Sequence, residues 1–319
     1  MSRPGKALEL TDKDFIEMFR RYGGAEMSRQ TGIRERNILA RRVRLEKNLE
    51  ITIQGPRHTF GLFPSKFYPQ RALVSLKQGY VLVASDAHYW PGEPGLMHRA
   101  LCFLGKELKP AAIILNGDVI DATSISRFPP IGWETRPSLV DEIEAAKERV
   151  FEIETACGKV RRIWTLGNHD ARYERRLATV APEYAKIHGV HLQDHFPLWE
   201  PSWSAWVNDE VVIKHRFKGG IHAPYKNTIH AGKTIVTGHL HSAKIIPFDD
   251  YNGTRYGVDT GCIADTDGPQ FTDYTEDNPK NWRSAFGVFR FAEGKLLQPE
   301  LVLKWDDKRV QFRGEIFTP

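Results

Sequence analysis

The sequence is poor in cysteine and has no long apolar run. Its 319 residues include three cysteines, Cys102, Cys157 and Cys262, which lie far apart and form no Cys-x-x-Cys pair. This spacing argues against a disulfide framework and against a thiolate zinc site, because both need paired or closely spaced cysteines. No apolar stretch approaches the roughly 18 residues that are needed to cross a bilayer. The chain also has no internal repeat and no low-complexity tract.

The first residues of the chain have no apolar core of the kind that a secretory signal carries. We therefore expect a cytoplasmic protein without a membrane partner. Apolar residues make up 41% of the chain and charged residues 27%, which is ordinary for a globular protein. A chain of this length can bury a full core, most simply in one large domain with a small appendage.

The positive charge is concentrated near the start of the chain. Residues 29–47 hold seven Arg or Lys and two Glu, so this stretch carries a net charge of +5, equal to the formal charge of the whole chain. Apolar residues at helical spacing predict a helix that follows the N-cap Thr11 and ends at Gly23-Gly24. After a short segment, a turn at residues 31–33 leads into a basic helix over residues 34–49.

This layout resembles a helix-turn-helix, and we expect residues 1–51 to form a small basic helical module. Arginines on its last helix are candidates for binding nucleic acid, since guanidinium groups bind phosphate oxygens. They are Arg34, Arg36, Arg41, Arg42 and Arg44. The alternative is a solvated face or a domain interface. We expect DNA as the partner of this module.

The rest of the chain has a different pattern. Residues 52–70 contain Gly55-Pro56, Gly61, Pro64 and Pro69, a composition typical of a linker. From residue 71 to residue 319, short apolar runs alternate with amphipathic segments, as in α/β domains. We therefore expect a linker over residues 52–70 and a single α/β domain over residues 71–319.

Five clusters of metal-ligating residue types occur in a fixed order in this domain. They are Asp86-Ala87-His88, Gly117-Asp118-Val119-Ile120-Asp121, Gly167-Asn168-His169-Asp170, His215 and Gly238-His239-Leu240-His241. The first three follow apolar strands, and open α/β sheets bind ligands at the carboxyl ends of their strands. Mixed nitrogen and oxygen donors favour Mn, Fe, Zn or Ni over Ca. A carboxylate such as Asp118 can bridge two cations about 3.5 to 4 Å apart, so the ordered set predicts a two-metal site.

The motif string over residues 80–241 resembles that of the calcineurin-like metallophosphoesterase superfamily. The resemblance implies an α/β fold, a four-layer α/β/β/α sandwich, with a dinuclear site between its two sheets. One metal ion would be held by Asp86, His88, Asp118 and His241. The other would be held by Asp118, Asn168, His215 and His239. His169 would be free for catalysis, with Asp170 as a candidate to orient its ring and Asp121 in a supporting role. We expect two divalent ions, with Mn favoured and Fe, Zn or Ni as alternatives.

One position departs from the family pattern. In many relatives the lone histidine is followed by glycine, whereas here Arg216 follows His215. His222, which follows Gly219-Gly220, is the alternative ligand, and both stay open. Three basic residues near the motifs are candidates for contacting substrate phosphates. They are Arg127, Arg172 and Lys218.

The resemblance implies a metal-dependent phosphoesterase in which two cations activate a water for in-line attack on phosphorus. His169 would protonate the leaving oxygen. Because a basic module precedes this domain, we expect a phosphodiesterase that acts as a DNA nuclease. One alternative is a phosphomonoesterase, either a protein or a small-molecule phosphatase, whose basic module docks an acidic partner. Another is a DNA-binding regulator with a vestigial phosphoesterase core.

Overall fold

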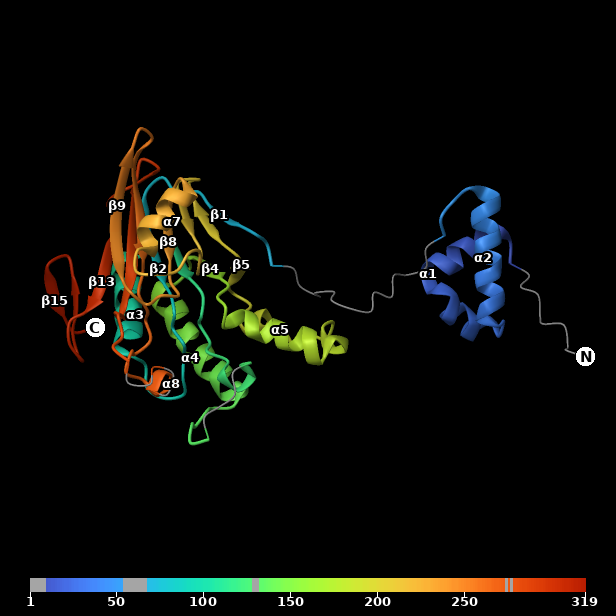
Figure 1. The fold of residues 1–319 in the computed structure, drawn as a ribbon, viewed down its shortest axis with the longest axis horizontal. Coiled ribbons are helices and arrows are strands. Elements are labelled where there is room, and N and C mark those ends of the chain that lie inside the picture. The colour runs from blue at the N-terminus through green and yellow to red at the C-terminus, as the bar shows by residue number, and fades with distance from the viewer. Residues whose placement is uncertain (1–9, 54–67, 128–131, 273–274, 276–277) are drawn as a thin grey trace, which may run out of the picture. The chain divides into compact units, whose positions relative to one another are not determined.

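The computed structural model describes residues 10–53, 68–127, 132–272, 275 and 278–319 (Figure 1). The chain divides into two compact units, residues 1–63 and residues 64–319. Most of the expected linker falls on residues 54–67, which lie outside the described residues, so the boundaries at residues 51 and 71 stay predictions. No helix of the described residues combines the length and the apolar character that crossing a membrane requires.

The first unit is helical. Helix α1 (Asp12–Thr31) begins after Thr11, whose side chain accepts a hydrogen bond from the backbone N–H of Asp14, and α2 (Glu35–Leu49) follows a turn. The first helical stretch is interrupted at Gly23, as expected, since Gly23 has a non-helical backbone, but the chain then resumes as a helix that runs to Thr31. The kink has φ 73°, a conformation that glycine adopts without steric cost. The core of this unit consists of Phe15, Phe19, Met27, Ile33, Ile38, Leu45 and Ile53.

The second unit contains two sheets. Among the described residues the first sheet has six strands, in the order β1 (Ala72–Val74), β6 (Ala205–Val207), β7 (Val211–Ile213), β8 (Thr234–Thr237), β10 (Gly253–Asp259) and β9 (Lys244–Asp250). The second runs in the order β15 (Glu315–Phe317), β14 (Val310–Phe312), β13 (Glu300–Lys304), β11 (Ala285–Ala292), β2 (Gly79–Ala84), β3 (Ala112–Leu115), β4 (Arg161–Thr165) and β5 (Glu200–Ser202), with β12 (Lys295–Leu296) paired to β11.

Helices cover the outer faces of the two sheets. Helices α3 (Leu96–Leu108) and α4 (Leu139–Cys157) pack together, and α3 also contacts β2, β11 and β13 of the second sheet. Helix α7 (Ala223–Ala231) packs on β8, β9 and β10 of the first sheet. The remaining helical segments are η1 (Thr123–Ile125), α5 (Asp170–Val180), η2 (Pro182–Tyr184), α6 (Leu192–His195) and α8 (Pro269–Thr272).

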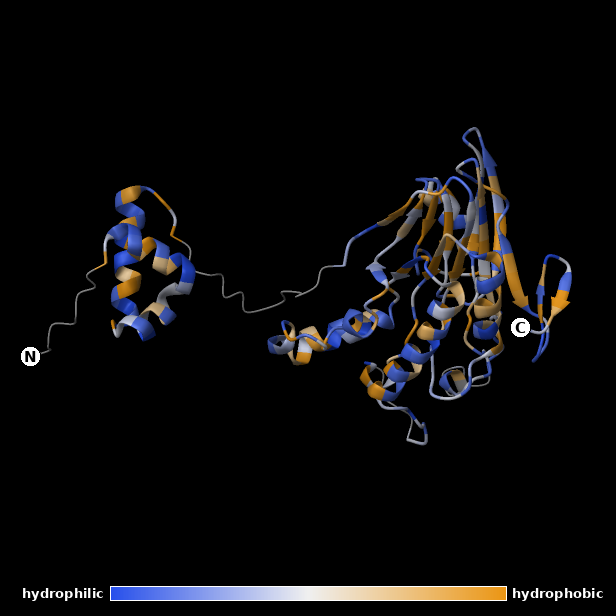
Figure 2. Ribbon diagram, turned by 180° about the vertical axis from the view of Figure 1, so that it is seen from behind, coloured by the Kyte–Doolittle hydropathy of each residue, from blue (hydrophilic) through white to orange (hydrophobic). Residues whose placement is uncertain are grey.

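Strand β2 shows how alternate side chains build the two cores. Val81 and Val83 belong to a core shared with residues of the first sheet, such as Val236, whereas Leu82 and Ala84 belong to a core shared with α3 and α4. Successive side chains of a strand point to opposite faces, so a strand buried on both faces must be apolar throughout. Figure 2 shows this concentration of apolar residues in the strands. The expected α/β/β/α sandwich is confirmed.

Candidate metal centre

The strand ends bring the five motifs together. Strands β2, β3 and β4 are parallel neighbours in the second sheet, and β7 and β8 are parallel neighbours in the first. Their carboxyl ends therefore meet along one edge of each sheet. Backbone bonds continue beyond the strands, because the Asp86 N–H donates to the Gly117 carbonyl over 2.9 Å and the Gly238 N–H donates to the His215 carbonyl over 2.9 Å.

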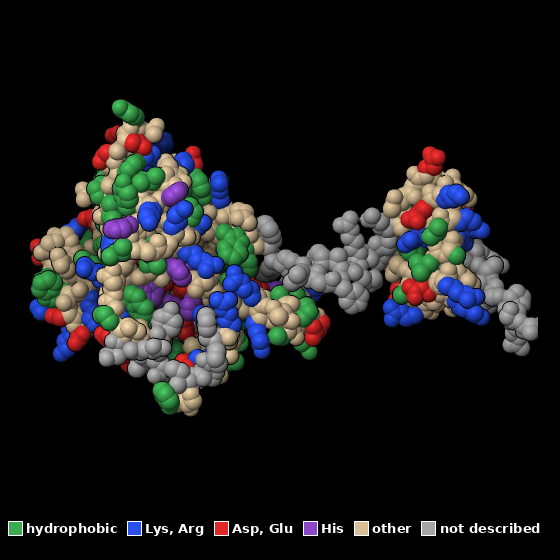
Figure 3. All heavy atoms as spheres, viewed as in Figure 1, with side chains coloured by type: hydrophobic (Ala, Val, Ile, Leu, Met, Phe, Trp, Pro, Cys, Tyr) green, Lys and Arg blue, Asp and Glu red, His purple; other side chains and the backbone are tan. Residues whose placement is uncertain are grey.

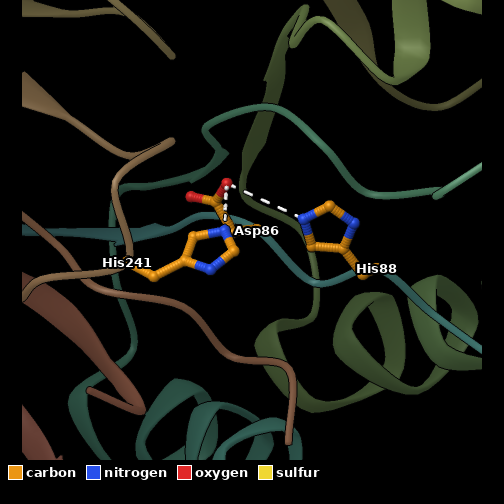
Figure 4. A group of neighbouring side chains, drawn as sticks. All are labelled: Asp86, His88 and His241. Carbon is orange, nitrogen blue, oxygen red and sulfur yellow. Dashed lines mark hydrogen bonds and ion pairs between the residues drawn. The ribbon is translucent and has the colours of Figure 1, made fainter. Parts of the chain in front are cut away.

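Three groups of potential ligand atoms result among the described residues; one of them, His88 with Asp121 and His169, includes the candidate catalytic histidine, and the other two adjoin each other. In the first group, Asp86 Oδ1 lies 3.1 Å from His241 Nε2 and 3.9 Å from His88 Nε2 (Figure 4). The second group consists of Asp118, His215 and His239. Within each group the ligand atoms all lie within 4.8 Å of one another.

The two groups touch each other through His215. Its Nε2 atom lies 3.0 Å from Asp118 Oδ2 and 3.9 Å from Asp86 Oδ1. The structure places His215, which is 1% exposed, beside the carboxylates. His222 is exposed at the N-terminus of α7 and belongs to none of the ligand groups of the described residues.

Unpartnered buried atoms show that these residues fit a pair of cations. Among the described residues, three polar atoms of the motif residues are buried without a hydrogen-bond partner, namely His88 Nε2, Asn168 Oδ1 and His241 Nδ1, while His215 Nε2 faces only the Asp118 carboxylate. Each such atom costs about 1 to 3 kcal/mol when it is left unsatisfied. Imidazole nitrogens, an amide oxygen and two buried carboxylates are also the donor set of borderline divalent metals.

The glycines of the motifs make room for the ligands. A Cβ at Gly167 would overlap Asp118 Oδ1, a Cβ at Gly238 would overlap Asp86 Oδ2, and a Cβ at Gly117 would overlap the His215 ring. Each of these glycines therefore allows the backbone of one motif to approach a ligand that another motif supplies. This is why the chemistry needs Gly-Asp, Gly-Asn and Gly-His pairs.

The ligand residues also have unusual backbone conformations. Positive φ values occur at Asp86 (54°), His88 (40°), Asp118 (52°), His239 (72°) and His241 (55°). The left-handed region costs a residue other than glycine on the order of 1 to 3 kcal/mol, and such strain clusters at functional sites. The fold therefore holds these five side chains in place at a cost in stability.

Mutual electrostatic stabilisation accompanies this burial. Burial raises the pKa of Asp86, but the neighbouring His241 and His215 imidazoles outweigh it and lower the pKa below its usual range. Burial lowers the pKa of His215, but the carboxylates of Asp118 and Asp86 outweigh it and raise the pKa to about 10. His239 is different, because burial and the nearby His215 lower its pKa. The charge on each of these side chains therefore depends on the charges of its neighbours.

His169 lies beside the ligand groups and contacts three charged residues. Its Nδ1 atom is 2.6 Å from Asp121 Oδ1, and its Nε2 atom is 3.2 Å from Arg172 Nη2 and 3.9 Å from Asp118 Oδ2. The same Asp121 oxygen lies 2.9 Å from His88 Nδ1. Burial lowers the pKa of His169, but Asp118 and Asp121 outweigh it and raise the pKa. Asp121 therefore contacts both a candidate ligand histidine, His88, and the candidate catalytic histidine, His169.

The expected role of Asp170 needs correction. Its buried carboxylate accepts hydrogen bonds from the backbone N–H groups of Asp118, Val119 and Gly167 and from the Trp164 indole. These contacts hold the loop that carries Asp118, whereas the carboxylate that orients the His169 ring belongs to Asp121. Adjacent residues on a helix do not face each other, and α5 begins at Asp170.

The candidate phosphate-binding residues have different positions. Arg172 donates to the Asp121 carbonyl over 3.0 Å and so lies at the centre. Lys218 is exposed and lines a cavity that reaches His239. Arg127 is exposed and directly precedes residues 128–131, which lie outside the described residues. Sequence reasoning missed Lys214 and Arg216, which line the same cavity as Lys218.

The arginines of the basic module divide into two kinds. Arg41 donates to the Leu10 carbonyl and to Asp12, and its guanidinium lies 4.8 Å from the Phe15 ring centroid. Arg42 is half-buried and lies 3.4 Å from Glu46. These two arginines thus have partners inside the module, and their assignment to nucleic acid stays a prediction. The other three candidates are exposed: Arg34, Arg36 and Arg44.

Comparisons with known proteins bear on the second unit. The sequence matches the family model described as calcineurin-like phosphoesterase over residues 79–256. None of the curated proteins matches the chain. Similar solved structures include wild-type Vps29 from Entamoeba histolytica complexed with zinc, at 13% identity over 75% of this chain and 98% of that chain, with a TM-score of 0.40. A structure described as a novel archaeal phosphodiesterase is 14% identical over 70% of this chain and 99% of that chain, with a TM-score of 0.36.

Proposed function

The chain belongs to the calcineurin-like phosphoesterase family, and from that premise we propose that it is a phosphodiesterase that cleaves DNA with two divalent metal ions. Members of this family depend on a pair of metal ions. The observation that carries the proposal is the meeting of two groups of buried ligand atoms, several of them without partners among the described residues. We propose Mn as the metal, with Fe, Zn or Ni as alternatives.

Each ion would have its own ligand group. Asp86, His88 and His241 would hold one, and His215 and His239 would hold the other together with Asn168. Asp118, which lies between His215 and His169, would bridge the two. When bound, the pair supplies an activated water for in-line attack and neutralises charge on the phosphoryl oxygens.

His169 supplies the proton for the leaving oxygen in this proposal. With its Nδ1 atom donating to Asp121, the Nε2 atom is the one that exchanges a proton with substrate. Arg172 lies 3.2 Å from that Nε2 atom, where its guanidinium can bind an oxygen of the scissile phosphate. Asp121 keeps the His169 ring in one orientation.

The basic module supports a polymeric substrate. Ile38 and Leu45 are buried on one face of α2, and Arg36 and Lys47 lie on the opposite face. Among the described residues, the structure records no ion pair for the side chains of Arg36, Arg44 or Lys47. An exposed row of unpaired cations neutralises phosphates by releasing counterions, and this attraction is independent of sequence. We therefore propose DNA as the partner of this face.

A panel of substrates tests the proposal. Purified protein with Mn²⁺ is offered labelled single-stranded and double-stranded DNA, bis-p-nitrophenyl phosphate and p-nitrophenyl phosphate. We expect cleavage of DNA and of the diester, and loss of both in Asp118→Asn but not in Asp307→Asn, whose side chain is 93% exposed. Activity restricted to the monoester would overturn the phosphodiesterase proposal and favour a phosphatase.

A further inference from the structure

A cavity of about 400 Å³ opens next to the second ligand group. It is lined by one histidine of that group, His239, and by three basic residues, Lys214, Arg216 and Lys218. None of the described residues that line it is acidic. Figure 3 shows histidine side chains in a hollow of the visible face, with Lys and Arg side chains gathered beside them. We call this space the cationic cavity.

The fold explains why these cations gather there. The Lys214 N–H donates to the Val236 carbonyl of β8 over 3.0 Å, and the Gly238 N–H donates to the His215 carbonyl over 2.9 Å, so the segment after β7 pairs with the end of β8 and with the segment that follows it. The chain bends at His215 and Phe217, and Lys214, Arg216 and Lys218 line the wall together with Phe217, while His215 belongs to the second ligand group. The Lys218 N–H donates to the Asn227 side chain over 3.0 Å, which fixes the end of this wall to α7.

The surroundings of the two ligand groups differ in chemistry. The Phe271 ring lies 5.2 Å from His88, and the Trp282 ring lies 4.6 Å from His241, so aromatic rings flank the first group. Cations flank the second group instead. Three like charges around one small cavity repel one another and raise the local concentration of anions. This asymmetry indicates that a negatively charged substrate extends from the centre on the side of the second ligand group.

We propose that the cationic cavity binds a second phosphate of the substrate, next to the phosphate that is cleaved. The inference rests on the proposed phosphodiesterase function and adds a binding subsite for the phosphate that neighbours the cleaved one. Arg216 can bind such a phosphate through two parallel hydrogen bonds, and the two lysines act as point charges. An isolated diester fills the metal centre only, so it gains nothing from the cavity.

The test compares a thymidine dinucleotide, which has one phosphate, with a trinucleotide, which has two. We expect the wild-type protein to hydrolyse the trinucleotide with the higher kcat/KM. Charged hydrogen bonds contribute enough that Arg216→Ala with Lys218→Ala should reduce the ratio of the two kcat/KM values by about tenfold. Arg216→Lys should retain part of the preference. Lys226→Ala, which removes an exposed lysine of α7 outside the cavity lining, should leave the ratio as it is in the wild type.

A second readout does not depend on turnover. In metal-free protein, fluorescence anisotropy of a labelled trinucleotide should show weaker binding by the double variant than by Lys226→Ala, with a salt dependence lowered by about one for each lost phosphate contact. Thermal unfolding and metal content check that the variants are intact.

The outcomes separate the two proposals. Wild-type protein that hydrolyses both nucleotides, with the same ratio in the double variant and with unchanged binding, overturns the cavity proposal alone. Wild-type protein that hydrolyses neither nucleotide nor bis-p-nitrophenyl phosphate overturns the proposed function, and the cavity proposal falls with it.

Discussion

Charged side chains are used differently in the two units of this chain. In the phosphoesterase unit, Asp86 and Asp118 are 0% and 1% exposed and are surrounded by histidines. In the basic module, Arg36 and Arg44 are exposed, whereas Arg41 turns inward to a backbone carbonyl and to Asp12. A buried charge must be compensated by its surroundings or by a ligand, whereas an exposed charge costs little and needs no partner. Burial therefore points to function more strongly than charge alone.

The largest effect is expected at the proposed bridging ligand. Asp118→Asn keeps the shape of the side chain but removes a buried charge from both ions, so metal content should fall below two ions per chain. Hydrolysis of bis-p-nitrophenyl phosphate should fall by at least on the order of 1000-fold, since the ions contribute several kcal/mol. Elemental analysis and initial rates measure this. A variant with two bound ions and near-normal rates would show that Asp118 is not a ligand.

His169 separates catalysis from metal binding within the same unit. His169→Gln should retain two metal ions, because the residue lies outside the proposed ligand groups, while kcat falls on the order of 100-fold to 10,000-fold. Asp121→Asn should give a smaller loss, about 10-fold to 100-fold, because it acts through the orientation of His169. If His169→Gln loses as much metal as Asp118→Asn does, the division between ligand and acid is wrong.

Replacing Asp170 tests whether a buried carboxylate near the centre contributes to stability instead of to catalysis. It accepts hydrogen bonds from backbone N–H groups of the Asp118 loop and from that of Gly167, which follows β4. Asp170→Ala leaves these donors unsatisfied and should lower the free energy of unfolding by roughly 2 to 4 kcal/mol, seen as reduced stability in urea. Asp307→Ala is the exposed control. Unchanged stability in Asp170→Ala would leave its buried contacts without a structural role.

The exposed arginines should give a smaller, salt-dependent effect. Replacing Arg36 and Arg44 by serine should weaken DNA binding and lower the slope of log affinity against log salt by about one for each lost phosphate contact. Arg29→Ser is a matched control, because Arg29 is exposed but lies 2.7 Å from Glu26. DNA affinity measured by fluorescence anisotropy at several salt concentrations distinguishes the double variant from the control. If the wild type, the double variant and Arg29→Ser bind DNA with equal affinity, this face does not bind DNA.

The smallest effect is expected at Arg41, which, unlike the exposed arginines, contacts residues of its own module. Its bonds to the Leu10 carbonyl and Asp12 and its contact with Phe15 stabilise the module. Arg41→Ala should therefore lower the stability of the module by about 1 to 2 kcal/mol, measured by thermal unfolding. A loss of DNA affinity at unchanged stability would show that Arg41 binds DNA and does not stabilise the module.

The resemblance to the family predicted the sandwich, and the order of the motifs predicted which residues meet at its centre. Each ligand motif follows a strand, and the carboxyl ends of parallel strands meet at one edge, so order along the chain translates into proximity. The orientation of His169 was not predictable in the same way. Asp170 is adjacent in sequence, but Asp121 reaches the ring because the loop after β3 crosses beside it.

The role of Arg41 could have been read from helical spacing. It lies three residues after Ile38 and four before Leu45, both of which are buried, so it shares their face of α2. The cationic cavity could not be predicted, because Lys214 and His239 come together only through the pairing of segments that follow β7 and β8. Local periodicity is readable in a sequence, whereas contacts between distant loops depend on the assembled sheets.

The most direct test of the account is a titration of metal-free protein with Mn²⁺, in which bound metal and hydrolysis of bis-p-nitrophenyl phosphate are followed together. We expect no hydrolysis without metal and full activity when two ions are bound per chain. Full activity in the presence of a chelator, or saturation at a single ion, would contradict a two-metal phosphodiesterase.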